Sequence, residues 1–289
     1  MNERIEVQGP YNFRQALKRL TIDPLQDLDL EAEAIKIPMM VDEKPVGVAV
    51  QQTGTFEKPV FHIKTTSRVD EKKVIDQLND IFHWDTPLET IHEHFQQSDL
   101  APLFTKYRGT PFVCDFSLYG CLMKTIIHQQ LNMAFAYELT KRFLTTFGFQ
   151  HDGLWYYPDP EKVSQLTLAQ LRALQFSQRK AEYVIDTSRM IVEGKLNLDS
   201  FAACDDEEIV EQLVALRGIG RWTAECFLMF GMGRLDLFPH QDIGIQNGLK
   251  KFYRLENKPL TEYMLEKSAA WKPYRTYASL YIWESLETE

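Results

Sequence analysis

Apolar and polar residues alternate along much of the first 66 positions, which is the pattern of half-buried β-strands. Val46, Val48 and Val50 give the clearest example, each separated from the next by one other residue. Similar strand patterns occupy 35–37 and 60–64, and helical spacing occupies 12–20 and 70–82. The N-terminal part therefore predicts a small antiparallel sheet accompanied by helices.

Beyond Pro111 the strand pattern fades and amphipathic helices follow one another, separated by short breakers. The breakers are Gly148 with the residue before it, and the proline-containing segments 157–160 and 272–273. The fold class predicted is α+β, with an N-terminal antiparallel α/β domain over 1–107 and an all-α domain over 108–289.

A pair of short helices joined by a glycine turn is the most informative pattern of the chain. The first helix carries Ile209, Leu213 and Leu216 on one stripe, after a run of four acidic residues that favours its N-terminus. The turn contains Gly218 and Gly220. Apolar residues of the second helix also share one face, namely Trp222, Cys226, Met229 and Phe230. A glycine turn that opens a helix leaves backbone N–H groups free to hold a phosphate, although glycine pairs also occur in plain turns.

A single acidic residue, Asp242, follows this helix pair and stands before a third helical stripe formed by Ile245, Leu249 and Phe252. An aspartate in this place is typical of a helix N-cap. Because the glycine hairpin precedes it, Asp242 could instead be a catalytic carboxylate that faces a ligand bound by the hairpin. Spacing alone does not decide between a helix cap and a catalytic residue.

Composition and charge limit the function classes. The chain has 289 residues, a net charge of −9 and no apolar run long enough to cross a bilayer. Its start lacks the pattern of a secretion signal, so we expect a cytoplasmic protein. The four cysteines show no metal-binding or disulfide spacing, and we interpret them as buried thiols. His83, His92 and His94 are interpreted as exposed loop residues rather than metal ligands.

The acidic balance opposes non-specific coating of DNA, because such binding depends on lysine and arginine. A local basic cluster would still permit a DNA interface. The residues available for it are Arg217, Arg221, Lys250, Lys251 and Arg254.

Taken together, these motifs resemble the helix-hairpin-helix DNA glycosylase superfamily, and within it the bacterial 3-methyladenine DNA glycosylase II branch. The resemblance rests on the hairpin segment 213–225 followed by the Pro239–Asp242 motif, and it covers nearly the whole chain. Further matching stretches are 126–131, 176–181 and 271–278. No four-cysteine spacing for the iron–sulfur cluster of some relatives is present.

The resemblance implies that Asp242 is the catalytic acid, which stabilises an oxocarbenium-like sugar or orients the attacking water. Relatives that also cut the DNA strand keep a nucleophilic lysine where this chain has Trp222, and tryptophan cannot form a Schiff base. A monofunctional enzyme is therefore expected, although Lys250 or Lys251 could replace that lysine if they are not surface phosphate contacts.

The same resemblance places Trp222 and Trp283 in the wall of a pocket for the extruded base, with Phe116 and Tyr119 as weaker members. Ordinary core packing is the alternative for each. Gln130 would fill the gap left in the duplex, next to Gln129, unless the two are a simple amide pair at a helix end.

DNA-binding residues implied by the resemblance are the backbone of Gly218 and Gly220, together with Thr223, Arg221, Gln129 and Gln130. The carbonyls of Leu216 and Gly218 are expected to bind a monovalent cation, with no other cofactor required. The expected partner is double-stranded DNA with damaged bases, bound by a monomer in the cytoplasm near the nucleoid and without membrane contact. The alternatives are a bifunctional glycosylase/lyase for oxidised bases and a non-catalytic DNA-binding protein.

Overall fold

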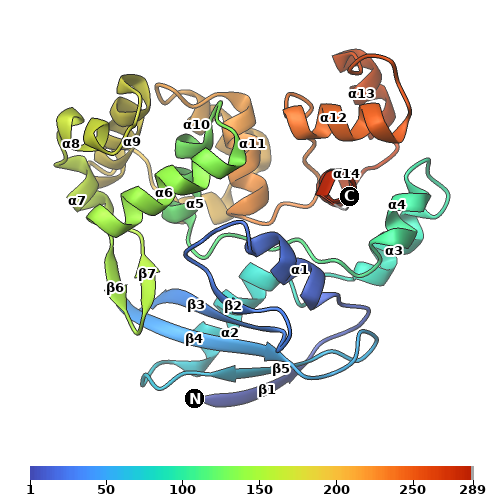
Figure 1. Ribbon diagram of the computed structural model, residues 1–289, viewed down its shortest axis with the longest axis horizontal. Coiled ribbons are helices and arrows are strands. Elements are labelled where there is room, and N and C mark those ends of the chain that lie inside the picture. Colours follow the sequence, from blue (N-terminus) through green and yellow to red (C-terminus); the bar gives the residue numbers. More distant parts are fainter. Residues whose placement is uncertain (288–289) are drawn as a thin grey trace.

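The computed structural model describes residues 1–287 and has a sheet at one side with a body of helices above it (Figure 1). Five antiparallel strands form the sheet in the order β1-β5-β4-β3-β2. Their bounds are Asn2–Glu6 (β1), Asp27–Asp29 (β2), Ala34–Val41 (β3), Lys44–Gln52 (β4) and Val60–Lys64 (β5). The predicted α+β class is confirmed.

The sheet buries one of its faces, as the alternating pattern predicts. Ile35 of β3 is paired with Val50 of β4, and Ile37 with Val48, and all four side chains are almost completely buried. The strands β1 and β2 were not predicted from the sequence. The residues of β1 alternate between exposed and half-buried, and none is fully buried, so the strand lacks a clear apolar alternation.

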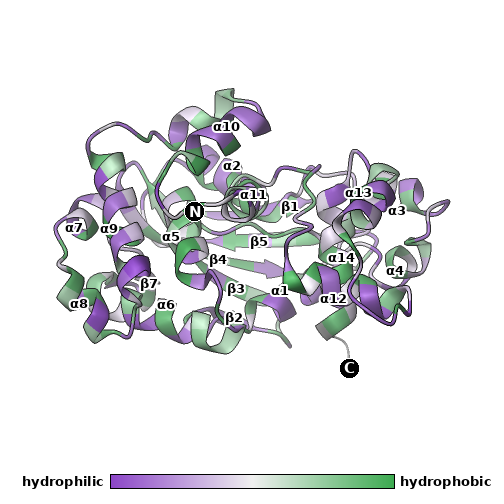
Figure 2. Ribbon diagram, turned by 90° about the horizontal axis from the view of Figure 1, so that it is seen from above, coloured by the Kyte–Doolittle hydropathy of each residue, from purple (hydrophilic) through white to green (hydrophobic). Residues whose placement is uncertain are grey.

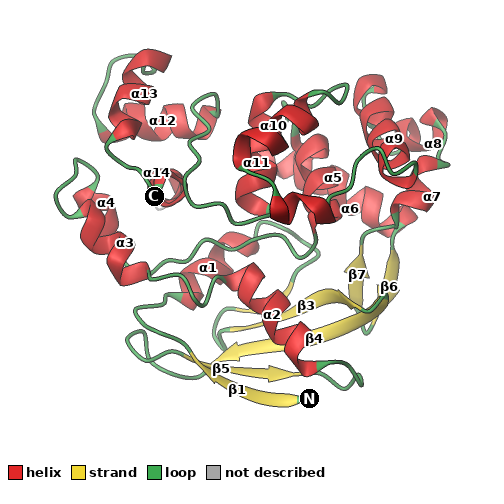
Figure 3. Cartoon of the chain, turned by 180° about the vertical axis from the view of Figure 1, so that it is seen from behind, coloured by secondary structure: helices red, strands yellow, loops and turns green. Residues whose placement is uncertain are grey.

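Four helices belong to the N-terminal part, and two of them lie over the sheet (Figure 3). Their bounds are Phe13–Leu20 (α1), Glu71–Phe82 (α2), Leu88–Phe95 (α3) and Ala101–Lys106 (α4). The predicted helices at 12–20 and 70–82 are confirmed as α1 and α2. The side chain of Asn12 caps α1 and that of Asp70 caps α2, which explains why each helix starts one residue later than the predicted range.

The helical body follows from Leu118 onward, with one small hairpin between two of its helices. Its helices are Leu118–His128 (α5), Met133–Phe147 (α6), Pro160–Ser164 (α7), Leu168–Ala173 (α8), Gln178–Val192 (α9), Asp206–Val214 (α10), Arg221–Phe230 (α11), Ile243–Phe252 (α12), Thr261–Ala269 (α13) and Arg275–Glu287 (α14), with a 3-10 turn at Asp199–Ala203. The hairpin strands are Phe149–His151 (β6) and Leu154–Tyr156 (β7). Seen from above, most helices carry both polar and apolar residues, as helices with one buried side do (Figure 2).

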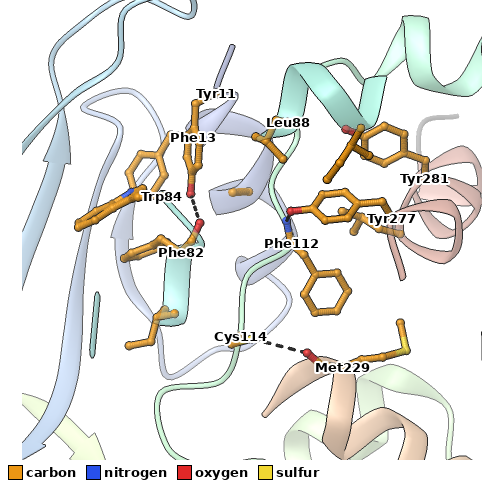
Figure 4. Close-up of a cluster of buried hydrophobic side chains, with 14 of the residues drawn as sticks. Tyr11, Phe13, Phe82, Trp84, Leu88, Phe112, Cys114, Met229, Tyr277 and Tyr281 are labelled. Carbon is orange, nitrogen blue, oxygen red and sulfur yellow. Dashed lines mark hydrogen bonds between the residues drawn. The ribbon is translucent and has the colours of Figure 1, made fainter. Parts of the chain in front are cut away.

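One hydrophobic cluster crosses the boundary predicted at 107/108. It contains Tyr11 and Phe82 from the N-terminal part and Tyr277 from α14 (Figure 4). The Tyr11 hydroxyl donates to the carbonyl of Phe82 at 2.6 Å, and the backbone N–H of Phe112 donates to the Tyr277 hydroxyl at 3.4 Å. The boundary between domains stays a prediction, but the two parts share a core.

Of the three histidines expected to be exposed loop residues, only His94 is exposed, and it lies in a helix; His83 and His92 are half-buried. His92 and His94 lie in α3, and His83 ends α2 with a φ of 53° and packs its ring against the Cys114 sulfur at 3.2 Å. Desolvation by burial lowers the pKa of His83. Of the four cysteines, Cys204 is half-buried and the others are buried. None of the helices within residues 1–287 has both the length and the apolar character needed to span a bilayer.

Candidate active site

Asp242 is the N-cap of α12. Its Oδ1 accepts a hydrogen bond from the backbone N–H of Ile245 at 2.9 Å, and its backbone is extended. The cap interpretation left open by the sequence is therefore correct. The positive end of the helix also favours a negative charge at this position. Capping does not exclude a chemical role, because the carboxylate has a second oxygen and further partners.

Two tryptophans from different helices donate to this carboxylate. Trp283 of α14 donates from Nε1 to Oδ1 of Asp242 at 2.9 Å, and Trp222 of α11 donates from Nε1 to Oδ2 at 3.2 Å. Both tryptophans and Asp242 are only half-buried. Three donors thus fix the orientation of one partly accessible carboxylate, and the two indole rings that the sequence placed in the base pocket flank it.

The local backbone allows this close approach. A methyl group at Gly244 would lie 2.9 Å from Asp242 Oδ1 and 3.0 Å from the Trp283 ring. The neighbour of Trp283 in α14, Glu284, fixes the position of this helix. Glu284 is completely buried and accepts hydrogen bonds from Arg19 and Gln15 of α1. Helices α1 and α14, distant in the chain, therefore position the indole that holds Asp242.

The two weaker pocket residues lie in different surroundings. Phe116 packs against the larger hydrophobic cluster, as Trp283 does. Tyr119 packs against the other cluster, and its hydroxyl pairs with Ser188 of α9 at 2.8 Å. Phe230, whose ring is stacked on Trp283 with centroids 5.8 Å apart, packs against both clusters.

The glycine hairpin has the geometry expected of an anion clamp. Gly218 has a φ of +89°, which favours glycine, and Gly220 caps α11 without any side-chain hydrogen bond. Within the described chain, no acceptor pairs with the backbone N–H groups of Arg221, Trp222 and Thr223. These N–H groups, at the positive end of α11, suit a phosphate.

Gln129 braces the hairpin from α5. Its Nε2 donates to the carbonyl of Gly218 and to the Thr223 hydroxyl, each at 2.9 Å. Thr223 is 2% exposed, so its hydroxyl is not available to the phosphate contact predicted from the sequence. Of the two carbonyls expected to bind a cation, Gly218 accepts from Gln129 and Leu216 accepts from the N–H of Ile219 at 3.1 Å.

Gln130 follows at the exposed end of α5 with a φ of +55°. The neighbouring backbone is fixed by Lys180, whose Nζ donates to the carbonyls of Ile126 and Gln129 at 3.0 Å. Burial lowers the pKa of Lys180 to about 8. The two glutamines are therefore not an equivalent amide pair: Gln129 points into the protein and Gln130 is exposed.

Both arginines of the hairpin, Arg217 and Arg221, form ion pairs with glutamates. Arg221 bridges Glu207 and Glu225, each at 3.0 Å. Arg217 pairs with Glu182 at 2.6 Å. This arrangement differs from the basic cluster expected from the sequence, because nearby acids offset both charges.

Sequence reasoning missed an internal ion pair close to this site. Lys124 of α5 pairs with Asp115, whose backbone N–H donates to the carbonyl of Phe230 at 2.7 Å. Burial is the largest single effect on the pKa of Lys124 and lowers it. The charge and hydrogen bond of Asp115, together with the nearby Tyr137 and Cys121, outweigh burial, so the net shift of this pKa is upward. Burial also raises the pKa of Cys226, with a further contribution from the charge of Asp242. The only sign of this ion pair in the sequence was a lysine, Lys124, inside the otherwise apolar helix α5.

Breaking this pair should be costly. Asp115 Oδ2 is buried and has no hydrogen-bond partner among the described residues. Lys124→Met would leave the half-buried carboxylate without its partner. We expect the free energy of unfolding to fall by about 2 kcal/mol, less than for a fully buried pair, because the two side chains are 20% and 23% exposed. The double variant Lys124→Met/Asp115→Asn should recover most of this loss in urea unfolding. Equal losses in the single and double variants would contradict a coupled pair.

No group of three or more histidine, cysteine or acidic residues suited to a metal ion occurs in the part of the chain that the structure describes.

A family model described as "HhH-GPD superfamily base excision DNA repair protein" matches residues 123–273. A Bacillus subtilis protein provisionally named DNA-3-methyladenine glycosylase YfjP is 45% identical over 286 residues, which are 99% of each chain.

Two solved structures are similar to this chain. The 3-methyladenine DNA glycosylase of Archaeoglobus fulgidus has a TM-score of 0.86 at 21% identity and covers 99% of this chain and 98% of its own, which shows the fold. The Schizosaccharomyces pombe 3-methyladenine DNA glycosylase in complex with abasic DNA has a TM-score of 0.60 at 28% identity, over 68% of this chain and 95% of its own.

Proposed function

Because the chain belongs to the HhH-GPD superfamily of base excision DNA repair proteins, we propose that it is a DNA glycosylase that releases alkylated bases. The observation that carries this proposal is the half-buried Asp242 carboxylate, held by two indole N–H groups beside the hairpin. Relatives named DNA-3-methyladenine glycosylase support the substrate class.

The reaction hydrolyses the bond between the base and C1′ of the sugar. The base must first leave the helical stack, because the bond is shielded inside the duplex. As the bond breaks, its electron pair leaves with the base and positive charge develops on the sugar. The negative charge of Asp242 stabilises this sugar cation and orients a water molecule. The water oxygen bonds to C1′, and its proton passes to the Asp242 carboxylate and from there to solvent.

An alkylated purine suits this arrangement, because alkylation of a ring nitrogen places positive charge on the base and makes it a good leaving group. The Trp222 and Trp283 rings beside Asp242 offer electron-rich surfaces to such a base. A cation over an aromatic face gains about 0.5–2 kcal/mol, depending on how far water is excluded. Recognition therefore depends on the aromatic rings and catalysis on the carboxylate.

The position of Trp222 favours a monofunctional enzyme over a bifunctional lyase. Its indole is fixed on Asp242 and has no amine that could form a Schiff base. We expect that borohydride, added during turnover on damaged DNA, traps no covalent enzyme–DNA adduct. The control is a bifunctional lyase on its own substrate under the same conditions, which must give an adduct. An adduct with this chain would support the alternative reaction on oxidised bases.

The two indole N–H groups can be tested separately from ring packing. Trp222→Phe and Trp283→Phe each keep an aromatic ring but remove one donor to Asp242, so we expect single-turnover base release to fall about 10-fold. Trp271→Phe is the matched control, because the fully buried Trp271 donates instead to Asp99 at 3.1 Å. Unchanged rates in both test variants would show that these hydrogen bonds do not position the acid.

The remaining parts of the proposal concern DNA and cofactors. The hairpin N–H groups would hold a phosphate of the damaged strand, and Gln130 would fill the gap left by the extruded base. A monovalent cation at the Leu216 and Gly218 carbonyls would assist the clamp, and no other cofactor is required. The protein would act as a monomer on DNA in the cytoplasm. Base release should therefore continue in the presence of EDTA.

A further inference from the structure

One side of α12 carries a stripe of exposed or half-buried residues that begins next to the proposed catalytic acid. Its opposite side is buried on α14, where a methyl group at Gly248 would lie 2.4 Å from Ile282. The stripe follows helical spacing through Ile243, Asn247 and Lys250 and ends at Arg254, just beyond the helix; Lys250 is half-buried and the other three are exposed. Ile243 is 64% exposed.

The far end of this stripe is hollowed. A shallow cavity of about 450 Å³ is lined by Asn247, Lys250, Lys251, Arg254 and Leu255. Three of these five residues are cations and none is acidic, in a chain whose net charge is −9. The two lysines and the arginine of this lining are hydrogen-bond donors that carry positive charge, and Asn247 adds an amide group. Charged donors of this kind recognise phosphate groups.

Two of the cations are not offset by acids. Within residues 1–287, Lys250 and Arg254 form no ion pair, whereas Arg217 and Arg221 at the hairpin are both bound to glutamates. Lys251 Nζ donates to the carbonyl of Ser285 at 3.2 Å, which holds this side chain against α14. Lys250 and Arg254 therefore place positive charge without an acidic partner at the C-terminal end of α12, whereas the two hairpin arginines are paired.

The cavity and Asp242 lie at opposite ends of the same helix, α12. Lys250 lies eight residues after Asp242, or about 12 Å along the axis of α12 at 1.5 Å per residue. In Figure 1, α11 and α12 stand on the same side of the molecule, away from the sheet. A strand held by the hairpin and by Asp242 could thus continue along α12 toward Lys250.

We infer that the cavity formed by Asn247, Lys250, Lys251 and Arg254 is a second phosphate site for the damaged DNA strand, separate from the hairpin clamp. This inference rests on the proposed function, since it needs DNA at Asp242. A simpler reason for lysines in this place is their attraction to the negative end of α12. That attraction would affect stability but not the salt dependence of DNA binding.

The test measures binding of the full chain to a duplex with an uncleavable abasic analogue over a range of salt concentrations. Each phosphate contact contributes about 0.9 to the slope of log affinity against log salt. Lys250→Gln should reduce this slope by about 1 and weaken damaged and undamaged duplexes equally. Lys250→Arg should restore the slope. Lys44→Gln, an exposed lysine at the sheet, controls for net charge and should leave it unchanged.

Base release separates failure of this inference from failure of the proposed function. Lys44→Gln should release bases at the wild-type single-turnover rate at every enzyme concentration. Lys250→Gln should need a higher enzyme concentration than wild type to reach half of its maximal rate, because it binds the strand more weakly. One outcome is that the wild type releases bases while Lys250→Gln keeps the salt-dependence slope of wild type or of Lys44→Gln. That result would refute the second phosphate site but not the proposed function. If the wild type releases no base, the proposed function fails first.

Discussion

Asp242→Asn is expected to lower single-turnover base release by about 10²–10³-fold, while the fold and the affinity for an abasic analogue are retained. Asparagine has nearly the same shape and can still cap α12, but it carries no charge to stabilise the sugar cation. Its amide group would also face the donor of Trp222 if its oxygen keeps the hydrogen bonds from Trp283 and Ile245.

The control for this variant is Asp159→Asn. Asp159 caps α7 by accepting from the N–H of Lys162 at 2.7 Å, so it tests the same change at a helix N-terminus outside the site. Thermal unfolding should shift little in either variant, and base release should fall only for Asp242→Asn. If Asp242→Asn keeps the wild-type rate, Asp242 is only a cap.

Gly218→Ala is expected to weaken DNA binding by at least about 10-fold and to lower the free energy of unfolding by about 1–3 kcal/mol. Its methyl group would lie 2.3 Å from the ring of Tyr183, in a backbone with a φ of +89°. The hairpin must move to relieve this overlap, and the N–H groups that we propose bind the phosphate move with it.

Gly220→Ala provides the matched comparison, because no atom lies within 4 Å of a methyl group there and its φ is −97°. We expect its unfolding temperature to match that of the wild type. Adding Tyr183→Ala to Gly218→Ala should recover part of the lost stability, since only the backbone strain remains. Wild-type unfolding and DNA affinity in Gly218→Ala would contradict the role given to the hairpin geometry.

Local patterns were sufficient to predict the helices around the hairpin, the N-cap at Asp242 and the alternation of β3 and β4. Each of these depends on neighbours in the chain, such as the glycine at 218 or the valines of β4. The α+β class followed from the same patterns. Family resemblance then supplied the roles of Trp222 and Trp283, which spacing alone could not separate from core packing.

Contacts between distant segments could not be predicted in this way. The half-buried ion pair of Asp115 with Lys124 joins a loop to α5, and nothing in the sequence marks these residues as partners. Gln129 turns toward the hairpin, and that depends on how α5 packs beside α11. The acids that occupy Arg217 and Arg221 lie on α9, α10 and α11, so the charge of the DNA interface emerged only from the packing.

The most direct test is a mass spectrum of the products that the wild type and Asp242→Asn form from methylated DNA. The wild type should release free alkylated bases and leave abasic sites in an unbroken backbone, because water is the nucleophile. Asp242→Asn should release these bases about 10²–10³-fold more slowly. Cleaved strands, or the absence of released bases with the wild type, would contradict hydrolysis at this site.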